Sequence, residues 1–158
     1  MRTAAAMNGD NPRRTTFLFS PPVNDALAWN LRLDDLAERI ERGFPGSSTD
    51  LEHGLGPRGA DALSFEVEVG EGVWLDGLAT TPFEGMGTVM ALLASAREAA
   101  VLAAWLRDSF IPSPELIEFS SEAAMDGGEE ASWRLPLSGS VEEIAETLQR
   151  HLDSAEAL

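Results

Sequence analysis

The sequence contains no cysteine, no lysine and no tyrosine, and only two of its 158 residues are histidine. Without cysteine there is no disulfide, no thiol nucleophile and no thiolate metal site. The two histidines, His53 and His151, are too few for a three-histidine zinc site and leave only two candidate bases for a Ser-His-Asp triad. These absences exclude several common kinds of catalytic site.

Long hydrophobic runs are also missing. The longest strongly apolar stretch, residues 88–96, stops at Arg97, so it is well short of the roughly 20 residues that span a bilayer. The first 14 residues have no apolar segment ahead of a cleavage site, which a signal peptide requires. We therefore expect a cytoplasmic protein that does not bind membranes.

Basic residues are scarce: 11 arginines face 27 acidic residues, and the net charge is −16. Nucleic acids and anionic membranes need cationic protein surface, so direct binding to either is not expected. The same field attracts a basic protein and speeds encounter with it. The alternative is that the acidity only provides solubility, or reflects a source whose proteins are generally acidic and poor in lysine.

The hydrophobic pattern predicts an α+β fold. Residues 1–14 are expected to be a disordered N-terminal tail, and residues 15–156 a single domain. We expect a mainly antiparallel, or mixed, sheet of five to six strands with about three helices packed on one face. The expected strands are 15–20, 62–69, 73–79, 88–93, 117–120 and 132–137, and residues 46–61 are expected to form a loop.

Three pairs with capping-box spacing mark the expected helix starts: Asp35 with Glu38, Ser95 with Glu98, and Ser140 with Glu143. The first helix covers about 35–42, and an apolar stripe that continues back through Leu33 and Trp29 allows an earlier start near Asn24. The second runs from Ala96 to about Ser109, and the third follows Ser140. A single long helix from Thr88 is the alternative to a strand at 88–93.

The stretch "VEVGEGVWLDG", residues 67–77, predicts a β-hairpin. A two-residue turn at 70–71 would mix charged and apolar side chains on one face. A three-residue turn at 70–72 places Val69 opposite Val73, keeps the apolar side chains together, and provides a glycine for the left-handed position. We therefore predict the three-residue turn.

This register crowds like charges on the solvent-facing side, where Glu66 lies opposite Asp76 and Glu68 lies opposite Trp74. Directly opposed like charges destabilise a sheet by up to about 1 kcal/mol. We predict a partner-binding surface, with Trp74 as the anchor and the three carboxylates as an acidic rim. The alternative is that a neighbouring segment covers Trp74 and that arginine neutralises the carboxylates.

Two loop motifs do not predict a ligand. "GLGPRG", residues 54–59, matches G-x-G-x-x-G, but no confident strand precedes it, no helix follows it, and Pro57 removes an amide that phosphate binding would use. "DGGEE", residues 126–130, lacks the alternating ligands of a calcium loop and is interpreted as a solvated turn. We expect no cofactor and no metal.

The histidines offer little chemistry. His53 lies near Asp50 and Glu52 and could serve as a weak metal ligand or a general base, although a solvated loop histidine is the commoner case. His151 is expected late in the last helix, away from its apolar stripe, where a proton would interact favourably with the helix dipole. Nucleophile motifs such as G-x-S-x-G are absent, so we expect no catalytic residue and no enzyme.

Three functions follow from this reading. The first is a non-enzymatic acidic module that docks a basic partner protein, as immunity proteins and small secretion chaperones of this size, charge and layout do. No motif connects the chain to either class. The second is a DNA-mimicking inhibitor of a nucleic-acid-binding protein, and the third is a small enzyme with a carboxylate–His53 site. The oligomeric state stays open.

Overall fold

A computed structural model describes residues 13–54, 61–128 and 132–157 of the chain, and the predicted N-terminal tail therefore lies almost entirely outside the described residues. Within these ranges seven strands form one sheet in the order β2-β3-β4-β5-β1-β6-β7, with all neighbouring strands antiparallel. The strands are β1 (Thr15–Ser20), β2 (Ser48–Glu52), β3 (Asp61–Gly70), β4 (Val73–Phe83), β5 (Met86–Ala94), β6 (Glu118–Ser121) and β7 (Trp133–Arg134).

The expected α+β class is confirmed, but five to six strands is wrong. The additional strand, β2, lies in the segment that we expected to be a loop, and it pairs with β3 from Ser48 opposite Glu66 to Glu52 opposite Ala62. Only Thr49 and Leu51 of β2 are half-buried. Of these two side chains only Leu51 is apolar, so the segment shows too little alternation of apolar and polar residues to predict a strand from the sequence.

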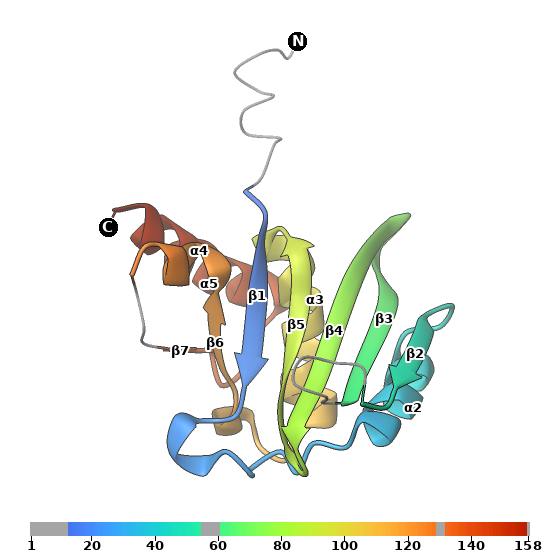
Figure 1. Cartoon of the computed structure of the whole chain (residues 1–158). Helices are drawn as coiled ribbons and strands as arrows, with labels where there is room; N and C mark the ends of the chain where they lie inside the picture. The colour runs from blue at the N-terminus through green and yellow to red at the C-terminus, as the bar shows by residue number, and fades with distance from the viewer. Residues whose placement is uncertain (1–12, 55–60, 129–131, 158) are drawn as a thin grey trace.

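Four α-helices accompany the sheet in the described ranges, and Figure 1 shows α2, α3 and α5 behind it. They are α2 (Leu33–Gly43), α3 (Ala96–Trp105), α4 (Glu122–Asp126) and α5 (Val141–Ala157). The first expected start is wrong, because α2 begins at Leu33 and Asp35 therefore lies inside its first turn. A short 3-10 turn, η1 (Val23–Asp25), occupies the region toward which we extended that helix.

The interpretation of residues 88–93 as a strand is confirmed, because they form most of β5. Helix α3 then begins after Ser95, whose side chain accepts a hydrogen bond from the backbone N–H of Glu98 while Glu98 caps Ser95 in return. This reciprocal pair satisfies two backbone donors at the helix start. At its other end α3 continues as a π-helical turn, η3 (Leu106–Phe110).

The core lies between the sheet and the helices. The inner face of the sheet contributes fully buried Phe17, Phe19, Leu63 and Val67, and α3 meets it with fully buried alanines. Alanine side chains permit close approach of a helix to a sheet, because they add little volume at the contact. The opposite face of the sheet, which we call the outer face, has no α2, α3 or α5 in front of it (Figure 1).

Two arginines connect segments that are distant in sequence. Arg14 donates to the carboxylate of Glu98 at 2.6 and 2.9 Å, and to the carbonyl of Leu93, so it ties β1 to the start of α3. Arg107, 4% exposed, donates to the carbonyls of Pro136 and Gly139 at 2.9 Å. Arg107 thus holds the segment that leads into α5 against the π-helical turn.

No helix in the described part of the chain is both long enough and apolar enough to cross a membrane.

Candidate functional site

The β3–β4 hairpin brings the four predicted partner-binding residues together. Glu66 lies directly opposite Asp76, and Glu68 lies directly opposite Trp74. Side chains that are opposite one another on paired strands share a face of the sheet. The predicted cross-strand register is therefore confirmed, and all four side chains lie on the outer face.

The turn differs from the predicted one. Gly70 pairs with Val73 and leaves a two-residue turn, while Val69 becomes the extra residue of a bulge between Glu68 and Gly70. Gly72 has a φ of +69°, the left-handed conformation that glycine adopts without a Cβ clash. The bulge restores the register that the shorter turn would otherwise shift by one residue.

Trp74 is 49% exposed, so the alternative in which a neighbouring segment covers it is wrong. In the described part of the chain no ion pair joins Glu66, Glu68 or Asp76 to an arginine. Glu68 instead accepts a hydrogen bond from the backbone N–H of Gly72 at 2.8 Å. The indole therefore stands among carboxylates whose charge no described arginine neutralises.

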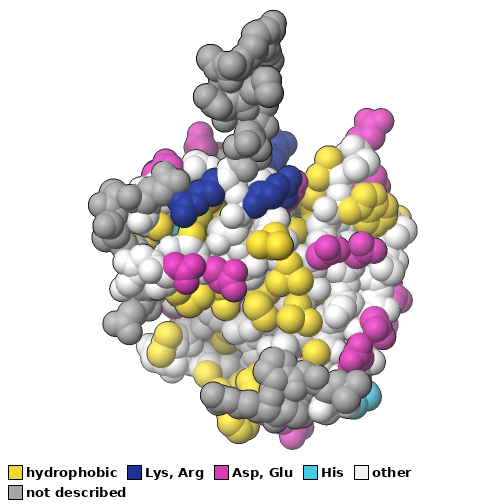
Figure 2. Space-filling model, turned by 45° about the horizontal axis from the view of Figure 1, so that its top comes forward, with side chains coloured by type: hydrophobic (Ala, Val, Ile, Leu, Met, Phe, Trp, Pro, Cys, Tyr) yellow, Lys and Arg dark blue, Asp and Glu magenta, His cyan; other side chains and the backbone are white. Residues whose placement is uncertain are grey.

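An apolar row lies beside this acidic group. Leu78 of β4 is opposite Met90 of β5, which is in turn opposite Leu18 of β1, while Leu92 of β5 is opposite Asp76. All four hydrophobic side chains are half-buried. Figure 2 shows hydrophobic side chains gathered at the centre of this view, with acidic side chains on both sides of them. We call Leu18, Leu78, Met90 and Leu92 the apolar row.

The apolar row was not predicted from the sequence, although a signal for it existed. "TTFLFS" and "TVMALL" are apolar at positions that point to both faces of their strands. Such a pattern is typical of strands that are covered on both faces. Placing Leu78, Met90 and Leu18 side by side, however, requires the pairing of β5 with β4 and β1, which local patterns do not specify.

A hollow of ≈ 480 Å³ joins the acidic group to the apolar row. Glu66 and Asp76 line it together with Leu78 and Leu92. Asp50 also lines it, from edge strand β2, where it lies opposite Ser64 on the outer face. Carboxylates from β2, β3 and β4 therefore border one side of a surface whose floor is apolar.

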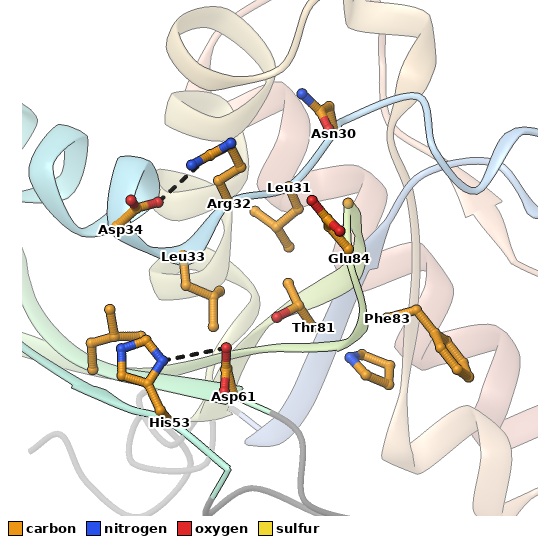
Figure 3. A pocket seen from close by; sticks show the side chains of 13 residues that line it. Asn30, Leu31, Arg32, Leu33, Asp34, His53, Asp61, Thr81, Phe83 and Glu84 are labelled. Atoms are coloured by element: carbon orange, nitrogen blue, oxygen red, sulfur yellow. Dashed lines mark ion pairs between the residues drawn. The ribbon is translucent and has the colours of Figure 1, made fainter.

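A second hollow, of ≈ 560 Å³, lies at the end of the sheet near the β4–β5 turn (Figure 3). Two weak ion pairs line it: Nδ1 of His53 is 3.4 Å from Oδ2 of Asp61, and Nε of Arg32 is 3.8 Å from Oδ1 of Asp34. The His53 side chain is 76% exposed. Water screens charges at such exposed positions strongly.

The predicted surroundings of His53 are different in the structure. Asp61 is its ion-pair partner, and neither Asp50 nor Glu52 lines this hollow. Across residues 13–54, 61–128 and 132–157 there is no group of three His, Asp or Glu side chains that could hold a metal ion. The "GLGPRG" stretch lies almost wholly outside the described residues, as does the end of "DGGEE".

The expectation for His151 is wrong, because its side chain is fully buried. Its Nε2 lies 2.8 Å from Oγ of Ser121, and the rings of Phe119 and Trp133 pack against it at 5.0 and 4.9 Å. Ser121 is fully buried as well. This serine–histidine pair is buried and connects β6 to α5. We therefore interpret it as a structural contact.

The chain as a whole matches no protein-family model, no curated protein and no solved structure. The geometry of its own surfaces therefore carries the functional argument.

Proposed function

We propose that this protein is a non-enzymatic module that docks a basic partner protein on the outer face of its sheet. The observation that carries the proposal is the position of Trp74. Its indole is half-exposed and stands beside Glu66, Glu68 and Asp76, which have no described arginine partner. The opposed pair Glu66 and Asp76 destabilises the monomer, and the exposed half of the indole adds nothing to its core.

The two features suit two stages of association. A net charge of −16 attracts a basic protein over long range and raises the rate of encounter. Once the partner arrives, an aromatic ring near the centre of an interface commonly contributes much of the binding free energy. Carboxylates around that ring contribute specificity for arginine and lysine more than raw affinity.

A biological role that fits this chemistry is neutralising or escorting a basic protein, as immunity proteins and small secretion chaperones do. The size, charge and α+β layout of the chain support this class. Capture from the source lysate would identify the basic protein.

The test is a pull-down from that lysate at low and at high salt, with the wild-type protein and two variants. Trp74→Ala removes the anchor, and Glu66→Gln with Asp76→Asn removes two charges. Phe83→Ala is the control for the first variant, because Phe83 is an exposed aromatic elsewhere on β4.

Asp25→Asn with Glu146→Gln is the control for the second variant, since it removes two exposed charges that lie on η1 and α5 and not on the sheet. We expect a basic protein to be retained at low salt by the wild type and both controls, and lost with both test variants. Absence of any retained basic protein at low salt contradicts the proposal. A different result would favour nucleic-acid mimicry over docking through Trp74. In that case Trp74→Ala still retains proteins, the charge variant does not, and the retained proteins are ones that bind nucleic acids.

A further inference from the structure

The apolar row is a surface that the acidic docking site does not by itself explain. β5 presents hydrophobic side chains to both faces of the sheet, but the described helices α2, α3 and α5 pack against only one of them. On the other face Met90 and Leu92 stay half-buried, next to Leu78 and Leu18. A strand with this pattern is typical of a sheet with a layer on each side.

The backbone of the sheet restricts what can form that layer. The central strands β4, β5 and β1 already use their amides and carbonyls in the ladder, because each has a paired neighbour on both sides. An extended segment laid on their apolar side chains would lose water from its own peptide groups without gaining partners, which costs free energy. An α-helix satisfies these groups internally, so it can cover an apolar sheet face.

The dimensions agree with one helix. From Leu78 through Met90 to Leu18 the apolar row crosses two strand spacings, or about 10 Å, which is about the diameter of a helix with its side chains. Along β4, Trp74 and Leu78 are four residues apart, or about 13 Å. That length corresponds to about two and a half helical turns.

The charges select the kind of helix. Glu66 and Asp76 lie beside Leu92, along the β3 flank of the apolar row. Arginine or lysine on the matching flank of a bound helix would pair with them, whereas acidic residues there would be repelled. A second copy of this chain is a poor occupant, because packing two outer faces together brings like charges near one another.

We infer that the occupant of the outer face is a basic amphipathic α-helix of the partner protein. Its apolar stripe covers the apolar row and Trp74, and its arginine or lysine side chains lie against Glu66 and Asp76. This inference rests on the proposed function and adds the conformation and pattern of the segment that the partner presents. Such a segment has apolar anchors at i, i+3, i+4 and i+7.

The test uses two synthetic peptides of about 18 residues, a length that gives about five helical turns. One has leucines at i, i+3, i+4 and i+7 flanked by arginines. The other has the same composition, but two central positions are exchanged for D-residues so that it does not form a helix. We expect the helical peptide to bind the full chain at least tenfold more tightly in calorimetry, and to gain helical circular dichroism on binding.

The location of the bound peptide can be measured without changing the apolar row. Because the chain has no cysteine, Ser64→Cys places a single fluorophore on the outer face, and Arg97→Cys places one on an exposed position of α3. A nitroxide on the helical peptide should quench the first fluorophore and leave the second unchanged. Equal quenching at both positions, or quenching only at position 97, overturns the inference.

A third measurement separates failure of the inference from failure of the proposed function. Met90→Gln should weaken the helical peptide about tenfold, while Leu137→Gln, at an exposed leucine elsewhere, should not. If the helical and the D-residue peptides bind with equal affinity, and Glu66→Gln/Asp76→Asn binds neither, the inference of a helical occupant is overturned. The proposal of docking to a basic partner then still stands. If either peptide binds Trp74→Ala and the charge variant as tightly as it binds the wild type, the result contradicts both the helix inference and the proposed function.

Discussion

Glu66 of β3 and Asp76 of β4 lie directly opposite one another on the outer face, with no described arginine joined to either. Two carboxylates in such a cross-strand pair repel each other, and the repulsion opposes folding. A sequence that only had to fold would gain stability by losing one of these charges.

Asp76→Asn should therefore stabilise the protein by about 0.2–1 kcal/mol. The urea midpoint of unfolding measures this at low salt, and the gain should shrink as salt screens the repulsion. Asp25→Asn, at an exposed position on η1, is the control and should leave the midpoint nearly unchanged. A lower midpoint for Asp76→Asn would show that the pair is not repulsive.

Gly77 of β4 gives the ring of Phe65 the space that it occupies in the core. A Cβ added at Gly77 would lie only 2.0 Å from the nearest ring atom of Phe65, which is itself buried. We expect Gly77→Ala to destabilise the protein by about 1–3 kcal/mol, because the ring must leave its position. Gly70→Ala is the matched control: its nearest neighbour atom is 3.6 Å away, an ordinary contact. Equal midpoints for the two variants in chemical denaturation would contradict this account.

Arg107 is a cation in the interior that donates to two backbone carbonyls and to the carboxylate of Asp108. Arg107→Leu removes the hydrogen bonds that the carbonyls of Pro136 and Gly139 accept, and a hydrogen bond to a charged group contributes about 1.5–3 kcal/mol. We expect a loss of at least about 2 kcal/mol by this reasoning. Arg97→Leu is the control, since Arg97 makes an exposed ion pair with Glu142 that contributes at most about 1 kcal/mol. A loss no larger than that of the control would rule out Arg107 as an anchor of the segment before α5.

The Arg14–Glu98 pair makes stability depend on pH. Burial works to raise the pKa of Glu98, but the hydrogen bonds from Arg14 and from the Ser95 amide outweigh it and hold the pKa below its ordinary value of 4.5. A carboxyl with a depressed folded-state pKa contributes stability that is complete above its unfolded pKa. That contribution is lost as the pH falls through the folded-state value.

Asp108 adds to the same trend, because the hydrogen bond from Arg107 lowers its pKa below 3.8. We expect the urea midpoint to fall on acidification below about pH 4.5, and Glu98→Gln to reduce the size of that fall. Glu146→Gln, on the exposed side of α5, is the control and should keep the wild-type pH profile. An unchanged profile in Glu98→Gln would show that the pair does not contribute to acid sensitivity.

Local patterns predicted the elements that local residues determine. The β3–β4 register follows from alternating side chains and glycines within one hairpin, and the start of α3 follows from Ser95 and Glu98. The missed elements depend on distant partners. β2 is a strand because β3 lies beside it, and α4 has only five residues. The capping pattern at Asp35 was misleading because α2 already begins at Leu33.

The candidate site divides in the same way. Trp74 and its three carboxylates belong to one hairpin, so their arrangement could be predicted, whereas the apolar row joins β4, β5 and β1. His151 was misplaced for a related reason. The apolar stripe of α5 marks only one buried face of the helix. Phe119, Ser121 and Trp133 pack against His151 on another side of it.

The two margins of the sheet bear on how this protein behaves at high concentration. Unpaired edge strands invite further strands to add, which leads to fibrils. β2 is five residues long and points Asp50 and Glu52 outward, while β7 has two residues and is soon followed by Pro136. Short, charged or proline-flanked edges discourage such growth. The edges of the described sheet therefore resist stacking into amyloid-like assemblies, even though its outer face carries the apolar row.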